Sequence, residues 1–446
     1  MKVSTQASTR ASMKRAALLL VVGLALLPER ALAQQRLCFP EATALPGEPA
    51  TPTVDGKVQG DMGWSSAFRY VFENASPGPH GALQGLRTPS DFFLSIEVNG
   101  DTGFDEDDTV VLALHAVGSD QYWRIHIRPL PPGVGDATNS APQEVLAWKA
   151  TSTTPSVDWS QTTASANPPW LQVRTATSGA ETARKAWNVE VRLPRASQEG
   201  LTLSGVEELD FYVAAFVAMT GTPGSKGTAL VWPRGAPAPD IDNPLTSTPP
   251  STTWGRAYLR EEDCGGVTLA ADGLRLLVGT EASAQVSQEQ SNRFTATVQN
   301  KSVDAARIAA AAEGLSATFR ISNEGITDPD YERWQIFPAP GNPTAPMTLP
   351  AEATETLATG EWTLTEAQQG VYARQPKQVV LVELDASPGS GTYITRRSAT
   401  REVRFAQGGN GGGGGGGLLG IVAAIVAALG ALVFGLLKRG KGNAKA

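Results

Sequence analysis

Residues 91–99 read Asp-Phe-Phe-Leu-Ser-Ile-Glu-Val-Asn, and this stretch decides the class of the fold. Apolar residues at positions 92, 94, 96 and 98 alternate with the residues of the other face, Phe93, Ser95, Glu97 and Asn99. A period of two is typical of a β-strand with one buried face. The same alternation recurs at 123–127 and 187–193. We therefore expect strands that bury one face and expose the other to water.

Residues 110–114 and 211–217 are nearly continuous apolar runs, which favour strands at the centre of a packed sandwich. The chain also holds Gly 46 and Pro 31, so many turns are expected. Similar apolar strand patterns occur at 274–278, 294–298 and 379–384. The sequence therefore predicts an all-β fold of two β-sandwich domains.

Both ends of the chain carry membrane signals. At the N-terminus, basic residues precede a short apolar run and Ala31-Leu32-Ala33, the small-x-small pattern of a signal peptidase site. Residues 1–33 are therefore expected to be a signal peptide. Residues 418–437 are apolar and uncharged, and as a helix they would span about 30 Å. They predict a C-terminal transmembrane helix.

The flanks of this helix predict its orientation. Lysines and Arg439 in the tail 438–446 place that tail in the cytoplasm, because basic residues stay on that side. The Gly-rich stretch 407–417 is expected to be a flexible linker. The domains then comprise 34–266 and 267–406, which we expect outside the cytoplasm, in the cell envelope.

Charge and cysteine content narrow the class of protein. The net charge is −7 and the basic residues are scattered, so no basic groove for nucleic acid is expected. The two cysteines, Cys38 and Cys264, are expected to form a disulfide in an oxidising compartment. The alternative is a pair of free buried thiols.

Three motifs lie in order along the first predicted domain. Residues 52–64 contain an apolar-Asp-Gly turn that leads to Trp64, 105–114 form an acidic turn entering a strand, and 187–194 read Trp-x-x-Glu-x-x-x-Pro. Together they resemble family 9 carbohydrate-binding-module-like domains of the DOMON-like superfamily, over roughly residues 50–262. The resemblance implies a β-sandwich that binds sugars or, in the wider superfamily with haem-binding domains, a cofactor, and it does not imply an enzyme.

Two further resemblances concern the rest of the chain. Residues 378–386 and 396–405 resemble the last two strands of immunoglobulin-like bacterial surface domains. The Gly-rich stretch, apolar helix and basic tail are similar to a GlyGly-type C-terminal sorting signal, which implies a rhomboid-like sorting protease as a partner. Permanent anchoring and cleavage both stay open.

The tryptophans divide into two groups. Trp64, Trp123 and Trp187 occupy motif or inward strand positions, so we expect them in the core. Three others lie in or beside the Ser/Thr/Pro-rich stretch 131–169, where a sugar ring could stack on them: Trp148, Trp159 and Trp170. The alternative is that these three pack the long loop onto the sandwich.

An acidic turn is the candidate metal site. Its carboxylates offer the oxygen ligands that Ca²⁺ takes, although the spacing lacks the EF-hand pattern: Asp101, Asp105, Asp107 and Asp108. The alternative is a solvated turn. The three histidines show no zinc spacing, and no GxSxG elbow is present. No other cofactor and no enzyme activity are expected.

These observations predict an exported, membrane-anchored protein that recognises polysaccharide or glycan through its first sandwich. The alternative is a structural or protein-interaction component of the cell envelope with no sugar ligand, because fold analogy alone does not separate the two.

Overall fold

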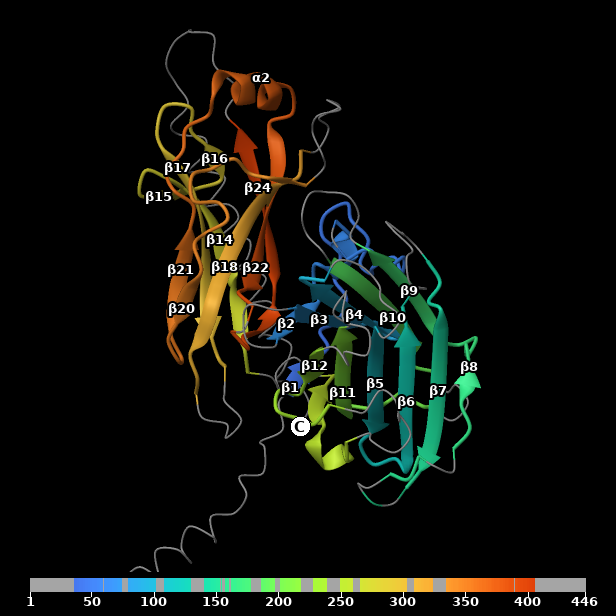
Figure 1. Ribbon diagram of the computed structural model, residues 1–446. Helices are drawn as coiled ribbons and strands as arrows, with labels where there is room; N and C mark the ends of the chain where they lie inside the picture. Colours follow the sequence, from blue (N-terminus) through green and yellow to red (C-terminus); the bar gives the residue numbers. More distant parts are fainter. Residues whose placement is uncertain are drawn as a thin grey trace, which may run out of the picture.

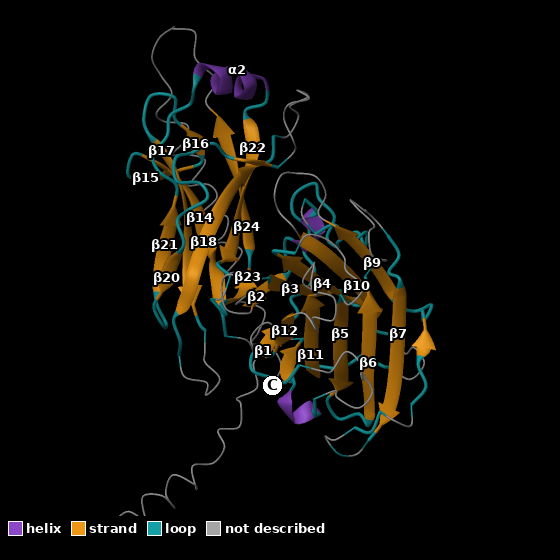
Figure 2. Ribbon diagram, in the orientation of Figure 1, coloured by secondary structure: helices purple, strands orange, loops and turns teal. Residues whose placement is uncertain are grey.

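The computed structural model describes residues 36–405, apart from 59, 74–78, 102–107, 130–139, 153, 155–156, 160–161, 178–185, 197–200, 218–227, 239–248, 260–264, 303–308, 324–333 and 389. Strands dominate these residues (Figure 2) and form three sheets. Besides the strands, the described residues hold one short α-helix and two 3₁₀ segments, which are α2 (Glu366–Arg374), η1 (Met62–Trp64) and η2 (Ser251–Thr253). The all-β prediction is confirmed for this part of the chain.

The first sheet forms one layer of the N-terminal sandwich. Its strands in spatial order are β1 (Arg36–Cys38), β13 (Gly255–Tyr258), β11 (Glu208–Val217), β5 (Thr109–Ala116), β6 (Gln121–Arg128), β7 (Glu144–Thr151) and β8 (Ser165–Ala166), and β12 (Thr228–Trp232) pairs with β11. The two continuous apolar runs of the sequence are β5 and β11, which pair with each other near the middle of the sheet.

The second sheet passes through both halves of the molecule, and we call it the shared sheet (Figure 1). Its order is β21 (Thr354–Ala358), β17 (Asn292–Asn300), β14 (Val267–Val278), β23 (Tyr393–Arg396), β2 (Phe68–Glu73), β3 (His80–Arg87), β4 (Asp91–Asn99), β10 (Ala186–Pro194) and β9 (Gln172–Thr177), with β15 (Glu281–Ser283) paired to β14. Strand β23 comes late in the chain, yet it lies between β14 and β2. The halves are thus joined by backbone pairing.

The third sheet completes the C-terminal sandwich. Its order is β16 (Gln285–Val286), β24 (Ser398–Phe405), β22 (Lys377–Ala386), β18 (Ala312–Ile321) and β19 (Gln335–Ile336), and β20 (Met347–Leu349) pairs with β18. Apolar side chains of this sheet pack against those of β14 and β17 in a core of its own.

The core of the N-terminal sandwich lies between the first sheet and β2–β3–β4–β10–β9. The alternating residues of β4 and β10 enter this core as predicted. Trp123 and Trp187 are buried in it, and Trp64 is buried in a smaller cluster nearby, so all three expected core positions are confirmed.

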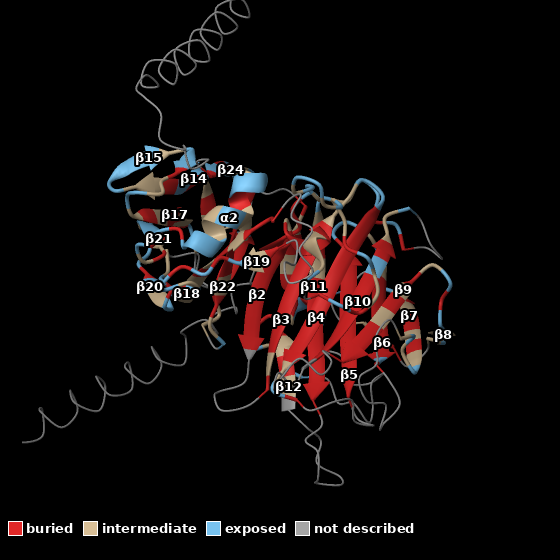
Figure 3. Ribbon diagram, turned by 90° about the horizontal axis from the view of Figure 1, so that it is seen from above, coloured by how far each residue is buried: buried red, intermediate tan, exposed pale blue. Residues whose placement is uncertain are grey.

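The outer face of β4 differs from the sequence expectation. Phe93 and Glu97 were expected to face water, but both are buried, and the strands around them are buried as well (Figure 3). Phe93 packs with Val58 and Trp64, because the segment before β2 lies over this face. Glu97 lies 3.9 Å from Arg69, which also binds Asp385 of the C-terminal sandwich at 2.7 Å. The second sandwich and the N-terminal segment therefore cover what would be a solvent face.

The predicted end segments lie outside the described residues. Within the described ranges, no helix has the length and apolarity that a bilayer crossing needs. The signal peptide 1–33, the linker 407–417, the membrane helix 418–437 and the tail 438–446 stay predictions.

Candidate binding site

Trp148 and Trp159 come together on the outer face of the first sheet. They join Tyr122, Tyr212 and Trp254 in one buried aromatic cluster. Trp148 is 5% exposed and Trp159 is 3% exposed. A sugar can stack only on an uncovered ring face, so their burial fits the alternative in which they pack the long loop onto the sandwich.

Trp170 lies apart from this pair. It packs against the core between the sheets, where its ring meets that of Trp123 edge to face at 5.5 Å. The structure therefore brings two of the three candidate tryptophans together and places the third on the other side of the first sheet.

The predicted calcium turn is described only in part. Asp105 and Asp107 lie outside the described residues, while Asp101 and Asp108 are buried. Asp101 accepts a hydrogen bond from Trp187 Nε1 at 2.9 Å. In the described part of the chain, no group of three His, Cys, Asp or Glu side chains is placed to hold a metal ion. Calcium binding stays a prediction.

Only one of the two cysteines of the predicted disulfide is among the described residues. Cys38 is buried at the end of β1, and β1 pairs in parallel register with β13 so that Cys38 lies opposite Tyr258. Cys264 follows Tyr258 along the chain but lies outside the described residues. The register is compatible with a Cys38–Cys264 bridge, which stays a prediction.

Two of the sequence motifs converge on Glu190, the glutamate of the Trp-x-x-Glu strand. Its carboxylate accepts hydrogen bonds from the backbone of the Asp-Gly turn, Asp55 N at 2.8 Å and Gly56 N at 2.6 Å. It also accepts one from Trp64 Nε1 at 2.7 Å. The motif residues therefore hold the segment before β2 against the shared sheet. Their role in this structure is structural.

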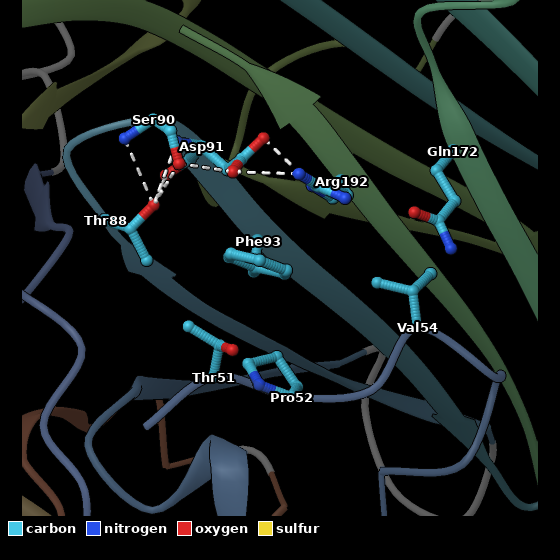
Figure 4. Close-up of a pocket in the computed structure, with 9 residues that line it drawn as sticks. All are labelled: Thr51, Pro52, Val54, Thr88, Ser90, Asp91, Phe93, Gln172 and Arg192. Carbon is cyan, nitrogen blue, oxygen red and sulfur yellow. Dashed lines mark hydrogen bonds and ion pairs between the residues drawn. The ribbon is translucent and has the colours of Figure 1, made fainter. Parts of the chain in front are cut away.

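A pocket of about 380 Å³ opens on the outer face of the shared sheet (Figure 4). Its floor is a row of cross-strand neighbours, because Phe93 of β4 pairs with Arg192 of β10, which pairs with Gln172 of β9. The opposite wall comes from Thr51, Pro52 and Val54, which belong to residues 51–56, and we call this stretch the covering segment. The volume is within the range of small-molecule sites. The residues that line it are Thr51, Pro52, Val54, Thr88, Ser90, Asp91, Phe93, Gln172 and Arg192.

Asp91 and Arg192 form a bidentate ion pair at one side of the pocket (Figure 4). Arg192 Nε donates to Asp91 Oδ1 at 2.9 Å and Nη2 donates to Oδ2 at 3.1 Å. Ser90 Oγ adds a bond to Oδ2 at 2.6 Å. Burial acts to raise the pKa of Asp91, but the bonds from Arg192 and Ser90 prevail and hold this pKa below its usual value. The pair is therefore charged and fixed at neutral pH.

The remaining polar groups of the pocket are available to a ligand. Within the described residues, Arg192 Nη1 and the Gln172 side-chain amide make no hydrogen bond to protein. Phe93, Pro52 and Val54 supply apolar surface beside them. Arg192 and Asp91 are the two charged side chains of the lining, and their charges cancel. The pocket suits a neutral ligand that carries both hydroxyl groups and apolar C–H faces.

Comparisons with known proteins give fold likenesses at low scores. No family model matches this chain, and no curated protein matches it. A family 9 carbohydrate-binding module from Caldicellulosiruptor kristjanssonii, in complex with cellotriose, is similar over 51% of this chain and 94% of its own, with 12% identity and a TM-score of 0.29. A putative carbohydrate-binding protein from Bacteroides uniformis ATCC 8492 covers 51% of this chain and 100% of its own, with 13% identity and a TM-score of 0.31.

A glycosidase likeness is weaker. The GH2 beta-galacturonidase from Eisenbergiella tayi bound to galacturonate is similar over 80% of this chain but only 44% of its own, with 10% identity and a TM-score of 0.18.

Sequence reasoning missed this pocket. Its residues come from four separate stretches, which only strand pairing and the fold of the N-terminal segment bring together. One signal was present, because Asp91 begins one alternating strand and Arg192 lies near the end of another, both at outward positions. Nothing in the sequence alone showed that the two strands are antiparallel neighbours.

Proposed function

We propose that this protein binds a neutral glycan, with one sugar residue held in the pocket between the covering segment and the shared sheet. The observation that carries the proposal is the convergence of the Asp91–Arg192 ion pair, the free Gln172 amide and the apolar surface of Val54 in one cavity. Sugars need such a mixture, because planar charged and amide groups bind their hydroxyls while apolar side chains contact their C–H groups.

The charge of the pocket selects among sugars. Since Asp91 already neutralises Arg192, a uronic acid would bring an unpaired negative charge next to the Asp91 carboxylate. We therefore expect uncharged sugars to bind more tightly than acidic ones.

The cellular setting is part of the proposal. The signals in 1–33 and 418–437 support an exported protein anchored in the membrane of a cell envelope, with the glycan outside the cytoplasm. The immunoglobulin-like second sandwich would then act as a spacer between pocket and membrane. Cleavage by a rhomboid-like protease is the alternative to permanent anchoring, and mass spectrometry of the mature C-terminus distinguishes the two.

The test is calorimetric titration of the full chain with cellotriose and glucose as neutral sugars and galacturonate as an acidic one, after a glycan array has widened the panel. Arg192→Lys and Gln172→Ala should each weaken binding of a neutral sugar by about tenfold or more, because each removes directed hydrogen bonds. Arg128→Lys is the matched control, because Arg128 is on β6 of the first sheet, is not among the residues that line the pocket, and is in an exposed pair with Glu144.

Two results would contradict the proposal. Equal binding by Arg192→Lys, Gln172→Ala and the wild type would remove the pocket from glycan recognition. If no glycan on the array bound, the alternative function would be favoured, namely a structural or protein-interaction component of the envelope.

A further inference from the structure

The covering segment is held over the pocket by two carboxylates. Asp61 Oδ2 accepts the backbone N–H of Thr53 at 2.7 Å. Glu190 accepts the N–H groups of Asp55 and Gly56 that follow directly after the lining residue Val54. The backbone N–H groups of 53, 55 and 56, the three residues of the segment that do not line the pocket, are therefore all bound by acidic side chains.

Close backbone approach adds to this hold. A Cβ on Gly56 would lie 2.4 Å from the carbonyl carbon of Thr175, and a Cβ on Gly63 would lie 2.3 Å from Pro52 N. Gly56 thus seats one end of the segment on β9, while Gly63 seats the other end on η1. The segment has little room to shift unless its hydrogen bonds break.

Glu190 also lies next to the ligand-binding side of β10. It is two residues before Arg192, so both side chains are on the outer face of the strand. Glu190 is 0% exposed, and its three hydrogen-bond donors all come from the N-terminal segment. None of these three donors is on a residue that lines the pocket.

We propose that Glu190 is a positioning residue, which holds the covering segment closed over the pocket and makes ligand binding there depend on pH. This inference rests on the proposed function of the pocket.

The direction of the pH effect follows from the burial of the carboxyl group. Burial raises the pKa of Glu190 to about 7, against the opposing effect of the bonds from Trp64, Asp55 and Gly56. When the segment opens, water reaches the group and its pKa returns toward 4.5, the ordinary value. The closed form therefore holds a proton more strongly than the open form, and closure weakens as pH rises between these two values.

Among the charged groups near Glu190, the negative charge of Asp55 also acts to raise its pKa. The others on neighbouring strand positions are Arg174, its cross-strand partner on β9, Arg192, two residues along β10, and Glu97, diagonal to it on β4. Burial also raises the pKa of Asp61, so this second carboxyl needs its own control.

The experiment measures amide hydrogen-exchange protection at Asp55 and Gly56 in the full chain from about pH 4.5 to 8, corrected for the intrinsic exchange rate. Protection in the wild type should fall by up to about tenfold per pH unit until about pH 7 and then level off. Glu190→Gln should abolish this slope, whereas Asp61→Asn and Glu97→Gln should retain it. Cellotriose, titrated over the same range, should bind the wild type more weakly at the upper end.

The outcomes separate this inference from the proposed function. Wild-type protection that does not change with pH would overturn the role of Glu190, and this holds even if Glu190→Gln fails to fold. A slope in protection without binding of cellotriose or of any array glycan would overturn the proposed function and leave the positioning role supported. Binding that is independent of pH would overturn the coupling.

Discussion

Tyr393 of the C-terminal sandwich is hydrogen-bonded to both backbone groups of Cys38 in β1. Its hydroxyl accepts the Cys38 N–H at 2.7 Å and donates to the Cys38 carbonyl at 3.2 Å. Both partners are buried, so water has little access to replace either bond. This contact joins the two ends of the described chain where strand β23 enters the shared sheet.

Tyr393→Phe tests the strength of that contact. The substitution leaves a buried N–H and a buried carbonyl of Cys38 without this partner, and we expect it to lower the free energy of unfolding by about 1–3 kcal/mol. Urea unfolding followed by tryptophan fluorescence measures the loss. Tyr258→Phe is the control because Tyr258 is only half-buried, and an equal loss in that variant would show that the contact is not special.

Gly56→Ala should damage the covering segment far more than Gly60→Ala. Both residues have positive φ, +85° and +83°, so each alanine bears a backbone strain of about 1–2 kcal/mol. The Cβ at position 60 meets open space, whereas the Cβ at position 56 would collide with Thr175. Thermal unfolding of the two variants gives the comparison, and equal melting temperatures would mean that the segment is not tightly seated.

His115 should make stability depend on pH. Burial favours the neutral ring, but hydrogen bonds with Asp210 at 2.8 Å and with the Ser119 carbonyl at 2.8 Å outweigh it and raise the pKa of His115 above 6.5. Because the pKa of His115 is higher in the folded protein than in the unfolded chain, protonation of His115 stabilises the fold. This stabilisation is complete at pH values below the unfolded pKa and is lost as pH rises through the folded pKa.

The measurement is the urea midpoint of the wild type and of His115→Asn between about pH 5.5 and 8.5. The difference between the two should be largest at the acidic end and shrink toward the alkaline end. Taking this difference removes the contribution of Glu190, which is common to both proteins. His80→Asn is the control, and a difference that stays constant with pH would exclude the ion pair with Asp210.

Trp148→Ala distinguishes packing from sugar stacking. Truncating a tryptophan in the aromatic cluster of the first sheet should cost about 3–5 kcal/mol of stability. Unfolding is measured beside glycan binding in the same preparation. If stability were unchanged and binding were lost, the stacking role of Trp148 would be restored and the pocket proposal would fail.

Local sequence pattern predicted the strands well, because the period of two in β4, β6 and β10 reports the inner face directly. It also placed Trp123 and Trp187 in the core, since both occupy inward positions of such strands. It misjudged the outer face of β4. Phe93 and Glu97 are covered by parts of the chain that are distant in sequence, and alternation carries no information about such contacts.

The candidate site was harder to predict than the fold, for a similar reason. Trp148 and Trp159 are in a long polar stretch that suggests exposure, yet their rings cluster because the outer face of the first sheet has apolar residues of its own, such as Val111 and Ala214. The pocket depends on the register between β4, β10 and β9, which places Phe93, Arg192 and Gln172 in one row. The register depends on how the strands pair in the folded protein, so the sequence of a single strand does not determine it.

The position of β23 has a mechanical consequence. Tyr393–Arg396 is hydrogen-bonded into the shared sheet, and Ser398–Phe405 follows at once as β24, paired along its length with β22 in the other layer. A tensile load applied at Phe405 along the axis of β24 therefore acts in shear on all of its hydrogen bonds to β22 before it reaches β23. Because these hydrogen bonds share the force, many of them must break together before β24 separates from β22.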